Sequence, residues 1–151
     1  MIQKLGACML AGLLLSAPAL QAADPQAIDA MQEIMAFSAY SGGNILPEQI
    51  PAADWAGFFV VDARRPEDYA ASHIDGAVNI EWRKVLESIG ELPEDRAVIV
   101  YCNTGSLSAQ AAFALKVATG REDILVLTGG YDSWKAKGGF DAHKRASEPR
   151  F

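Results

Sequence analysis

The sequence predicts an α/β protein with a mostly parallel sheet and helices on both of its faces. Short apolar runs of strand length alternate with short helical stretches along most of the chain. Polar or glycine-containing segments follow several of these runs. In open parallel sheets ligands bind beyond the carboxyl ends of the strands, so we expect one functional edge.

Five apolar runs supply the expected strands, at residues 45–46, 58–62, 77–80, 98–101 and 124–127. Between and after them lie the expected helical segments, at residues 47–50, 66–72, 83–88, 109–117 and 131–137. Pro66 suits the first turn of its helix. Gly129 and Gly130 favour a tight turn from the last strand into the last helix.

The N-terminus is typical of a secretory signal peptide over residues 1–22. It has one positive charge at Lys4, then an apolar stretch too short to cross a bilayer comfortably, then small residues. We expect cleavage after Ala22 or Ala23, and therefore a periplasmic protein. Cys8 lies before most of the apolar stretch instead of following it, which argues against a lipid attachment site and a membrane anchor.

The mature chain would keep 129 of the 151 residues, enough for one ordinary domain. Without Lys4 the chain has 12 basic and 19 acidic side chains, a net charge of −7. This negative charge disfavours nucleic acid and anionic membranes as partners. One cysteine, Cys102, would remain, so no internal disulfide can form. One cysteine and two distant histidines also disfavour a metal site.

Three regions follow the expected signal peptide. Residues 23–43 form an N-terminal extension, in which we expect an amphipathic helix over 24–40. The favoured role of this helix is to cover the flank of the domain, and binding a partner is the alternative. Residues 44–138 form the main domain. The polar tail at 139–151 is expected to be loosely ordered.

Cys102 is the candidate nucleophile. It ends a buried strand and precedes a short loop rich in Gly, Ser, Thr and Asn, after which a helix begins. Backbone N–H groups and the positive end of the helix dipole would favour a thiolate there and lower the thiol pKa. A small inert core cysteine is the alternative, but such a residue normally has apolar neighbours on both sides.

Four segments, in order and spacing, resemble the single-domain rhodanese family of sulfurtransferases over about residues 44–138. They are Val61-Asp62-Ala63-Arg64 with Pro66-Glu67-Asp68-Tyr69, His73-Ile74-Asp75-Gly76-Ala77-Val78-Asn79-Ile80, Val100-Tyr101-Cys102-Asn103-Thr104-Gly105-Ser106-Leu107-Ser108, and Leu127-Thr128-Gly129-Gly130-Tyr131-Asp132-Ser133-Trp134. The resemblance implies a rhodanese-like, mostly parallel five-stranded sheet.

It also implies a chemistry. The Cys102 thiolate would take the outer sulfur of a donor such as thiosulfate, become a persulfide, and pass that sulfur to cyanide or a thiol. Backbone amides of the loop would cradle the negative charge, from Asn103, Thr104, Gly105, Ser106, Leu107 and Ser108. The partners would be small sulfur donors and acceptors, or a periplasmic thiol protein, and no cofactor is needed.

The loop departs from the family in its charge. Family members commonly carry a cation there, often an arginine just before the final serine, where this chain has Leu107. Arg83 and Lys84 could bring a cation from elsewhere, or could simply begin a solvated helix. The neutral loop leaves a second interpretation open, a non-catalytic or sulfur-carrier module that serves a protein partner.

Other motif residues favour supporting roles. Asp62 and Arg64 could pair with each other or brace the loop, and His73 would fix the turn before Asp75. A phosphatase or arsenate reductase is disfavoured, because Ser108 stands where a clamping arginine would fall.

Overall fold

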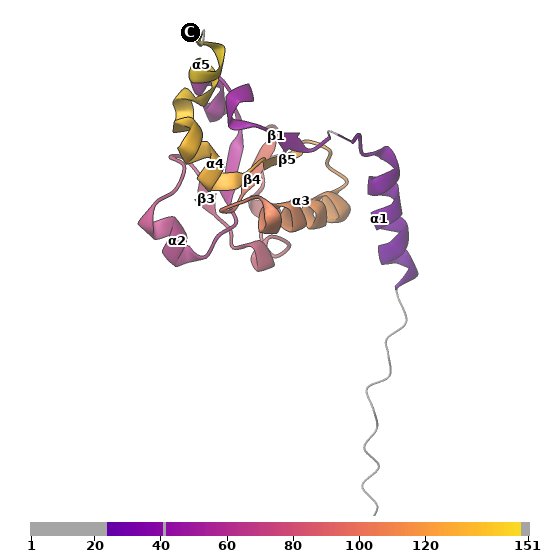
Figure 1. Ribbon diagram of the computed structural model, residues 1–151. Helices are drawn as coiled ribbons and strands as arrows, with labels where there is room; N and C mark the ends of the chain where they lie inside the picture. Colours follow the sequence, from indigo (N-terminus) through magenta and orange to yellow (C-terminus); the bar gives the residue numbers. More distant parts are fainter. Residues whose placement is uncertain (1–23, 41, 149–151) are drawn as a thin grey trace, which may run out of the picture.

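The computed structural model describes residues 24–40 and 42–148, and these contain a five-stranded parallel sheet (Figure 1). The strand order is β1-β5-β4-β2-β3, and every neighbouring pair is parallel. The strands are β1 (Asn44–Ile45), β2 (Phe59–Asp62), β3 (Val78–Asn79), β4 (Val98–Tyr101) and β5 (Ile124–Leu127). The predicted α/β fold and each predicted strand are therefore confirmed, with ends that differ by at most two residues.

Helices connect these strands and cover the sheet. The α-helices are α1 (Pro25–Phe37), α2 (Pro66–Ala71), α3 (Ser106–Thr119), α4 (Gly130–Lys137) and α5 (Ala142–Ser147). Short 3₁₀ segments are η1 (Pro47–Gln49), η2 (Ala52–Gly57), η3 (Trp82–Lys84), η4 (Ile89–Glu91) and η5 (Gly139–Asp141).

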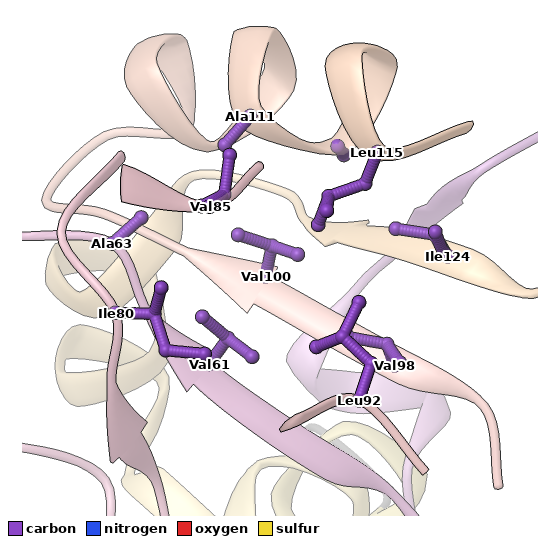
Figure 2. Close-up of a cluster of buried hydrophobic side chains, with 11 residues drawn as sticks. Val61, Ala63, Ile80, Val85, Leu92, Val98, Val100, Ala111, Leu115 and Ile124 are labelled. Atoms are coloured by element: carbon purple, nitrogen blue, oxygen red, sulfur yellow. The ribbon is translucent and has the colours of Figure 1, made fainter. Parts of the chain in front are cut away.

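Alternate residues of the buried strands face two separate cores. Val98 and Val100 of β4 pack beneath α3 and the segment around Val85, in the cluster that Figure 2 shows. Ile99 and Tyr101 face the opposite core, which η1, η2 and α4 help to enclose. Because successive side chains of a strand point to opposite faces, a strand covered on both sides is continuously apolar, as this one is.

The strand register brings the carboxyl ends of the strands to one edge. Asp62, the last residue of β2, is paired with Tyr101 of β4 and with Asn79 of β3. Cys102 directly follows the end of β4, and Arg64 lies two residues after the end of β2. The site residues that the sequence places after different strands therefore share one edge.

The predicted helix over 83–88 is wrong. The chain there forms only the 3₁₀ turn η3 and hydrogen-bonded turns, in which the carbonyl of Lys84 accepts from the amides of both Glu87 and Ser88. The amide of Trp82 donates to Ala63 O, and Val85 is buried under α3, so the segment follows the surface of the core. Tertiary contacts override the weak helical pattern.

The expectation of a loose tail after residue 138 is also wrong. Residues 139–147 form η5 and α5, and Ala142 is buried. Phe140 packs edge-on against Trp55 and Trp134, with ring centroids 5.4 and 5.3 Å away. Burial of these apolar side chains orders a segment that is polar on average.

The predicted N-terminal helix corresponds to α1, which Asp24 caps through a 3.0 Å bond from the Gln26 amide. It lies beside the end of α3 in Figure 1 and has no fully buried residue. The predicted signal peptide and the rejected lipid site at Cys8 lie outside the described residues. Among the described helices, none is long and apolar enough to cross a membrane.

Candidate active site

Cys102 lies directly after β4 and is 3% exposed. Its carbonyl accepts a 2.8 Å hydrogen bond from the Tyr131 amide, and the carbonyl of Asn103 accepts one of 3.0 Å from the Asp132 amide. The start of α4 therefore holds the first two residues of the loop through their backbones.

Gly130 permits this close approach. Its φ is +58°, and a Cβ at this position would lie 2.2 Å from Cys102 O and 2.6 Å from Asn103 O. Those contacts are with backbone atoms, so any side chain would push the loop and α4 apart. The turn predicted at Gly129 and Gly130 thus also positions the nucleophile.

The sulfur of Cys102 accepts hydrogen bonds from its own loop. The Gly105 amide lies 3.2 Å from Sγ and the Ser108 hydroxyl 3.6 Å from it. The same hydroxyl lies 3.0 Å from Gly105 O and so has two acceptors within reach. Gly105 has a φ of +105° and occupies the N-cap position of α3, which lets the chain turn its amides toward the sulfur.

These contacts set the ionisation of the thiol. Burial alone would raise the pKa of Cys102, but hydrogen bonds from the Ser108 amide and hydroxyl and from the Gly105 and Thr104 amides outweigh burial, so its pKa lies below the ordinary value. A larger fraction of the sulfur is therefore thiolate at neutral pH, and thiolate is the nucleophilic form.

Ser108→Ala should raise the pKa of Cys102, because the hydroxyl favours the thiolate. The thiol then needs a higher pH to ionise, so its alkylation at neutral pH should slow severalfold and its pH profile should move to higher pH. Iodoacetamide alkylation, followed by mass spectrometry across a pH series, measures both. Ser106→Ala removes a hydroxyl that lies near Thr104 Oγ1 and should leave the profile in place. Identical profiles for Ser108→Ala and the wild type would contradict the assignment.

The segment from Cys102 to Ser108 surrounds the sulfur, but the predicted loop is three residues too long, because α3 already begins at Ser106 and not at Ala109. Exposure varies along this segment. Cys102 and Ser108 are buried, whereas the side chains of Asn103, Thr104, Ser106 and Leu107 are exposed. Leu107 is the second residue of α3 and is 37% exposed. The loop thus buries its sulfur among donors and presents neutral side chains to solvent.

Asp62 and Arg64 form a buried ion pair beside this loop. Arg64 Nη2 lies 2.6 Å from Asp62 Oδ2, and the two side chains are 6% and 0% exposed. Arg64 also donates to Ser72 O at 2.6 Å and to Asn103 Oδ1 at 3.3 Å. Pairing and bracing, the two roles that the sequence left open, therefore occur together.

Two tyrosines complete this support, and sequence reasoning assigned them no role at the site. Tyr101 OH donates to Asp62 Oδ2 at 2.7 Å, and burial raises the Tyr101 pKa far above its ordinary value, so the phenol remains a donor. The Arg64 guanidinium lies 4.4 Å from the ring centroid of Tyr131. The alternation of side chains along β4 could have indicated the position of Tyr101, because it places Tyr101 on the face opposite α3, in the same core as Tyr131.

Neither Arg83 nor Lys84 makes a side-chain hydrogen bond or ion pair with the loop within the described residues. Arg83 pairs with Glu81 at 3.0 Å and is 69% exposed. His73 lies where the sequence predicts a fixed turn, with Nδ1 2.9 Å from Tyr69 O and its ring stacked on Tyr69.

Comparison with known proteins agrees with this geometry. The rhodanese-like domain family matches residues 45–137. The chain is 35% identical over 92 residues to a thiosulfate sulfurtransferase GlpE of Pseudomonas fluorescens, covering 61% of this chain and 84% of that protein. It is 34% identical over 92 residues to the protein of the same name from Pseudomonas aeruginosa, covering 61% of this chain and 83% of that protein.

Solved structures give the same fold. A rhodanese-related protein of Thermoplasma volcanium superposes with a TM-score of 0.52 at 28% identity, over 60% of this chain and 92% of its own. The human single-domain sulfurtransferase TSTD1 superposes with a TM-score of 0.55 at 22% identity, over 64% of this chain and 98% of its own, and supports the fold alone. The protein belongs to the rhodanese-like domain family.

Proposed function

We propose that this protein is a periplasmic sulfurtransferase that moves a sulfane sulfur from a donor such as thiosulfate to a thiophilic acceptor, cyanide or a thiol. The observation that carries the proposal is the Cys102 sulfur, buried at the end of β4 with hydrogen-bond donors around it and a lowered pKa. The GlpE relatives, named thiosulfate sulfurtransferases, support the same class of reaction.

The reaction has two halves. In the first, the Cys102 thiolate attacks the outer sulfur of thiosulfate; a new S–S bond forms, the S–S bond of the donor breaks, and sulfite leaves with its electron pair. In the second, the acceptor attacks the outer sulfur of the persulfide and Cys102 leaves as thiolate. Both halves place negative charge beside the Gly105 amide and the Ser108 hydroxyl, which stabilise it.

The test uses the purified protein and its intact mass. Incubation with thiosulfate or another sulfane donor should add one sulfur atom. Adding cyanide should remove that sulfur as thiocyanate and restore the starting mass. A chain whose mass never changes with any sulfane donor would contradict the proposal.

A sulfur-carrier role is the second candidate, and the neutral loop favours it. Such a module would still gain one sulfur at Cys102 but would pass it only to a protein thiol. Turnover with thiosulfate and cyanide separates the two roles, because a carrier would load once and then stop.

We also propose that the chain is exported, from the charged start, short apolar stretch and small residues over residues 1–23. The mature protein should begin at Ala23 or Asp24. N-terminal sequencing of periplasmic material checks this, and retention of residues 1–22 or a lipid on Cys8 would contradict it.

A further inference from the structure

We propose that the sulfur donor suited to this site is an organic persulfide, R–S–SH, in preference to the thiosulfate dianion. This inference rests on the proposed function and names the substrate class of the same cysteine. It follows from the charges that surround Cys102 and from the apolar side chain at the start of α3.

The first observation is that the exposed side chains of the loop are neutral. Asn103, Thr104 and Ser106 offer hydrogen-bonding groups without charge, and Leu107 presents an apolar surface at 37% exposure. Leu107 directly precedes Ser108, whose hydroxyl bonds the sulfur. The exposed surface that follows Cys102 along the loop and into α3 therefore carries no positive charge at Asn103, Thr104, Ser106 or Leu107.

The second observation is that the arginines following β2 and β3 are already paired. Arg64 is held by Asp62 in a buried pair, Arg65 lies 3.1 Å from Asp68, and Arg83 lies 3.0 Å from Glu81. Each positive charge is thereby offset by a carboxylate within the protein. Lys135 directs its ammonium toward the ring of Tyr131, 5.9 Å from the centroid.

Electrostatics then distinguishes the donors. Thiosulfate brings two negative charges to a partly buried thiolate, and like charges repel more strongly near a protein interior than in water. A persulfide brings at most one negative charge, and none in the S–H form that the thiolate attacks. Its leaving thiolate carries one negative charge, which the Gly105 amide and the helix dipole of α3 can stabilise. The organic group can contact Leu107.

The loading step balances without an oxidant or a reductant. The Cys102 thiolate attacks the terminal sulfur of R–S–SH and forms a new S–S bond. The S–S bond of the donor breaks, and its electron pair leaves with RS⁻. The proton stays on the transferred sulfur, so Cys102 becomes Cys–S–SH and the oxidation level of the sulfane sulfur is unchanged.

The test measures the rate at which Cys102 gains one sulfur, by intact mass, with thiosulfate and with N-acetylcysteamine persulfide as probes. In the wild type the persulfide should load faster. Leu107→Arg should speed thiosulfate loading about tenfold to a hundredfold through a charge-assisted hydrogen bond to the sulfonate. Persulfide loading should show no such gain, and the thiosulfate gain should shrink as salt rises.

Two controls separate charge from other effects. Phe113→Arg adds the same charge to the same helix at 36% exposure, six residues further along or about 9 Å; it should leave both rates within about twofold. Leu107→Gln removes the apolar group without adding charge and should give no thiosulfate gain.

The outcomes separate this inference from the proposed function. If thiosulfate loads the wild type as fast as the persulfide does, or if Leu107→Arg brings no gain, the donor assignment is overturned while sulfur transfer stands. If neither donor adds sulfur to Cys102, the proposed function itself fails.

Discussion

Cys102→Ser should abolish both persulfide formation and sulfur transfer. A serine hydroxyl is not ionised by hydrogen bonds of this strength at neutral pH, so the loop would hold no nucleophile able to form an S–S bond. The substitution is nearly isosteric at a residue that is 3% exposed, and the backbone bonds from Tyr131 and Asp132 do not depend on the sulfur. The variant should therefore fold like the wild type but should not transfer sulfur.

The measurements are intact mass after incubation with sulfane donors and thiocyanate formation with cyanide. Thermal unfolding of the variant within a few degrees of the wild type excludes a folding defect as the cause. Turnover that persists in Cys102→Ser would mean that another group carries the sulfur, and the proposed mechanism would be wrong.

The sequence predicts the centre of this fold well because the signals there are local. A continuous apolar run marks β4, and the abrupt change to small polar residues after Tyr101 marks the end of the strand. The same change places Cys102 at the sheet edge where ligands of parallel sheets bind. Strand direction and the order of polar turns were sufficient to bring Asp62 and Cys102 to one edge.

What the sequence did not predict depends on contacts between distant segments. The bond from Tyr101 OH to Asp62 and the one from Arg64 to Asn103 each span 39 residues. The tail is ordered because Phe140 packs on Trp55, a residue that lies near the start of the domain in the sequence. Neither hydrophobic period nor propensity carries this information, because both describe a segment by its own residues.

The full role of Arg64 also depends on contacts between segments that are distant in the sequence. Its spacing from Asp62 permits a pair, which local geometry suggests, but only the fold shows that both side chains are buried and that the guanidinium also reaches Asn103 in the loop and lies over Tyr131. One arginine thereby links the ends of β2 and β4 to the start of α4.

Arg64→Met should lower the free energy of unfolding by about 3–5 kcal/mol, because it leaves the carboxylate of Asp62 buried without its partner. The loss includes the bonds that Arg64 donates to Ser72 O and Asn103 Oδ1. Urea unfolding, followed by tryptophan fluorescence, measures the change. Without the bond from Arg64, the Asn103 side chain should be less firmly held. The rate at which Cys102 gains sulfur should also fall.

Arg65→Met is the matched control, since it removes the same charge one residue away. Arg65 is 71% exposed and pairs with Asp68 at the surface, where solvent screens the pair, so its loss should cost much less stability than the loss of Arg64. The double variant Asp62→Asn with Arg64→Met should regain part of the stability, because it no longer buries an unpaired charge. Equal losses for Arg64→Met and Arg65→Met would show that burial of the Asp62 pair does not govern stability, and would remove the physical basis for Arg64 as the brace of the loop.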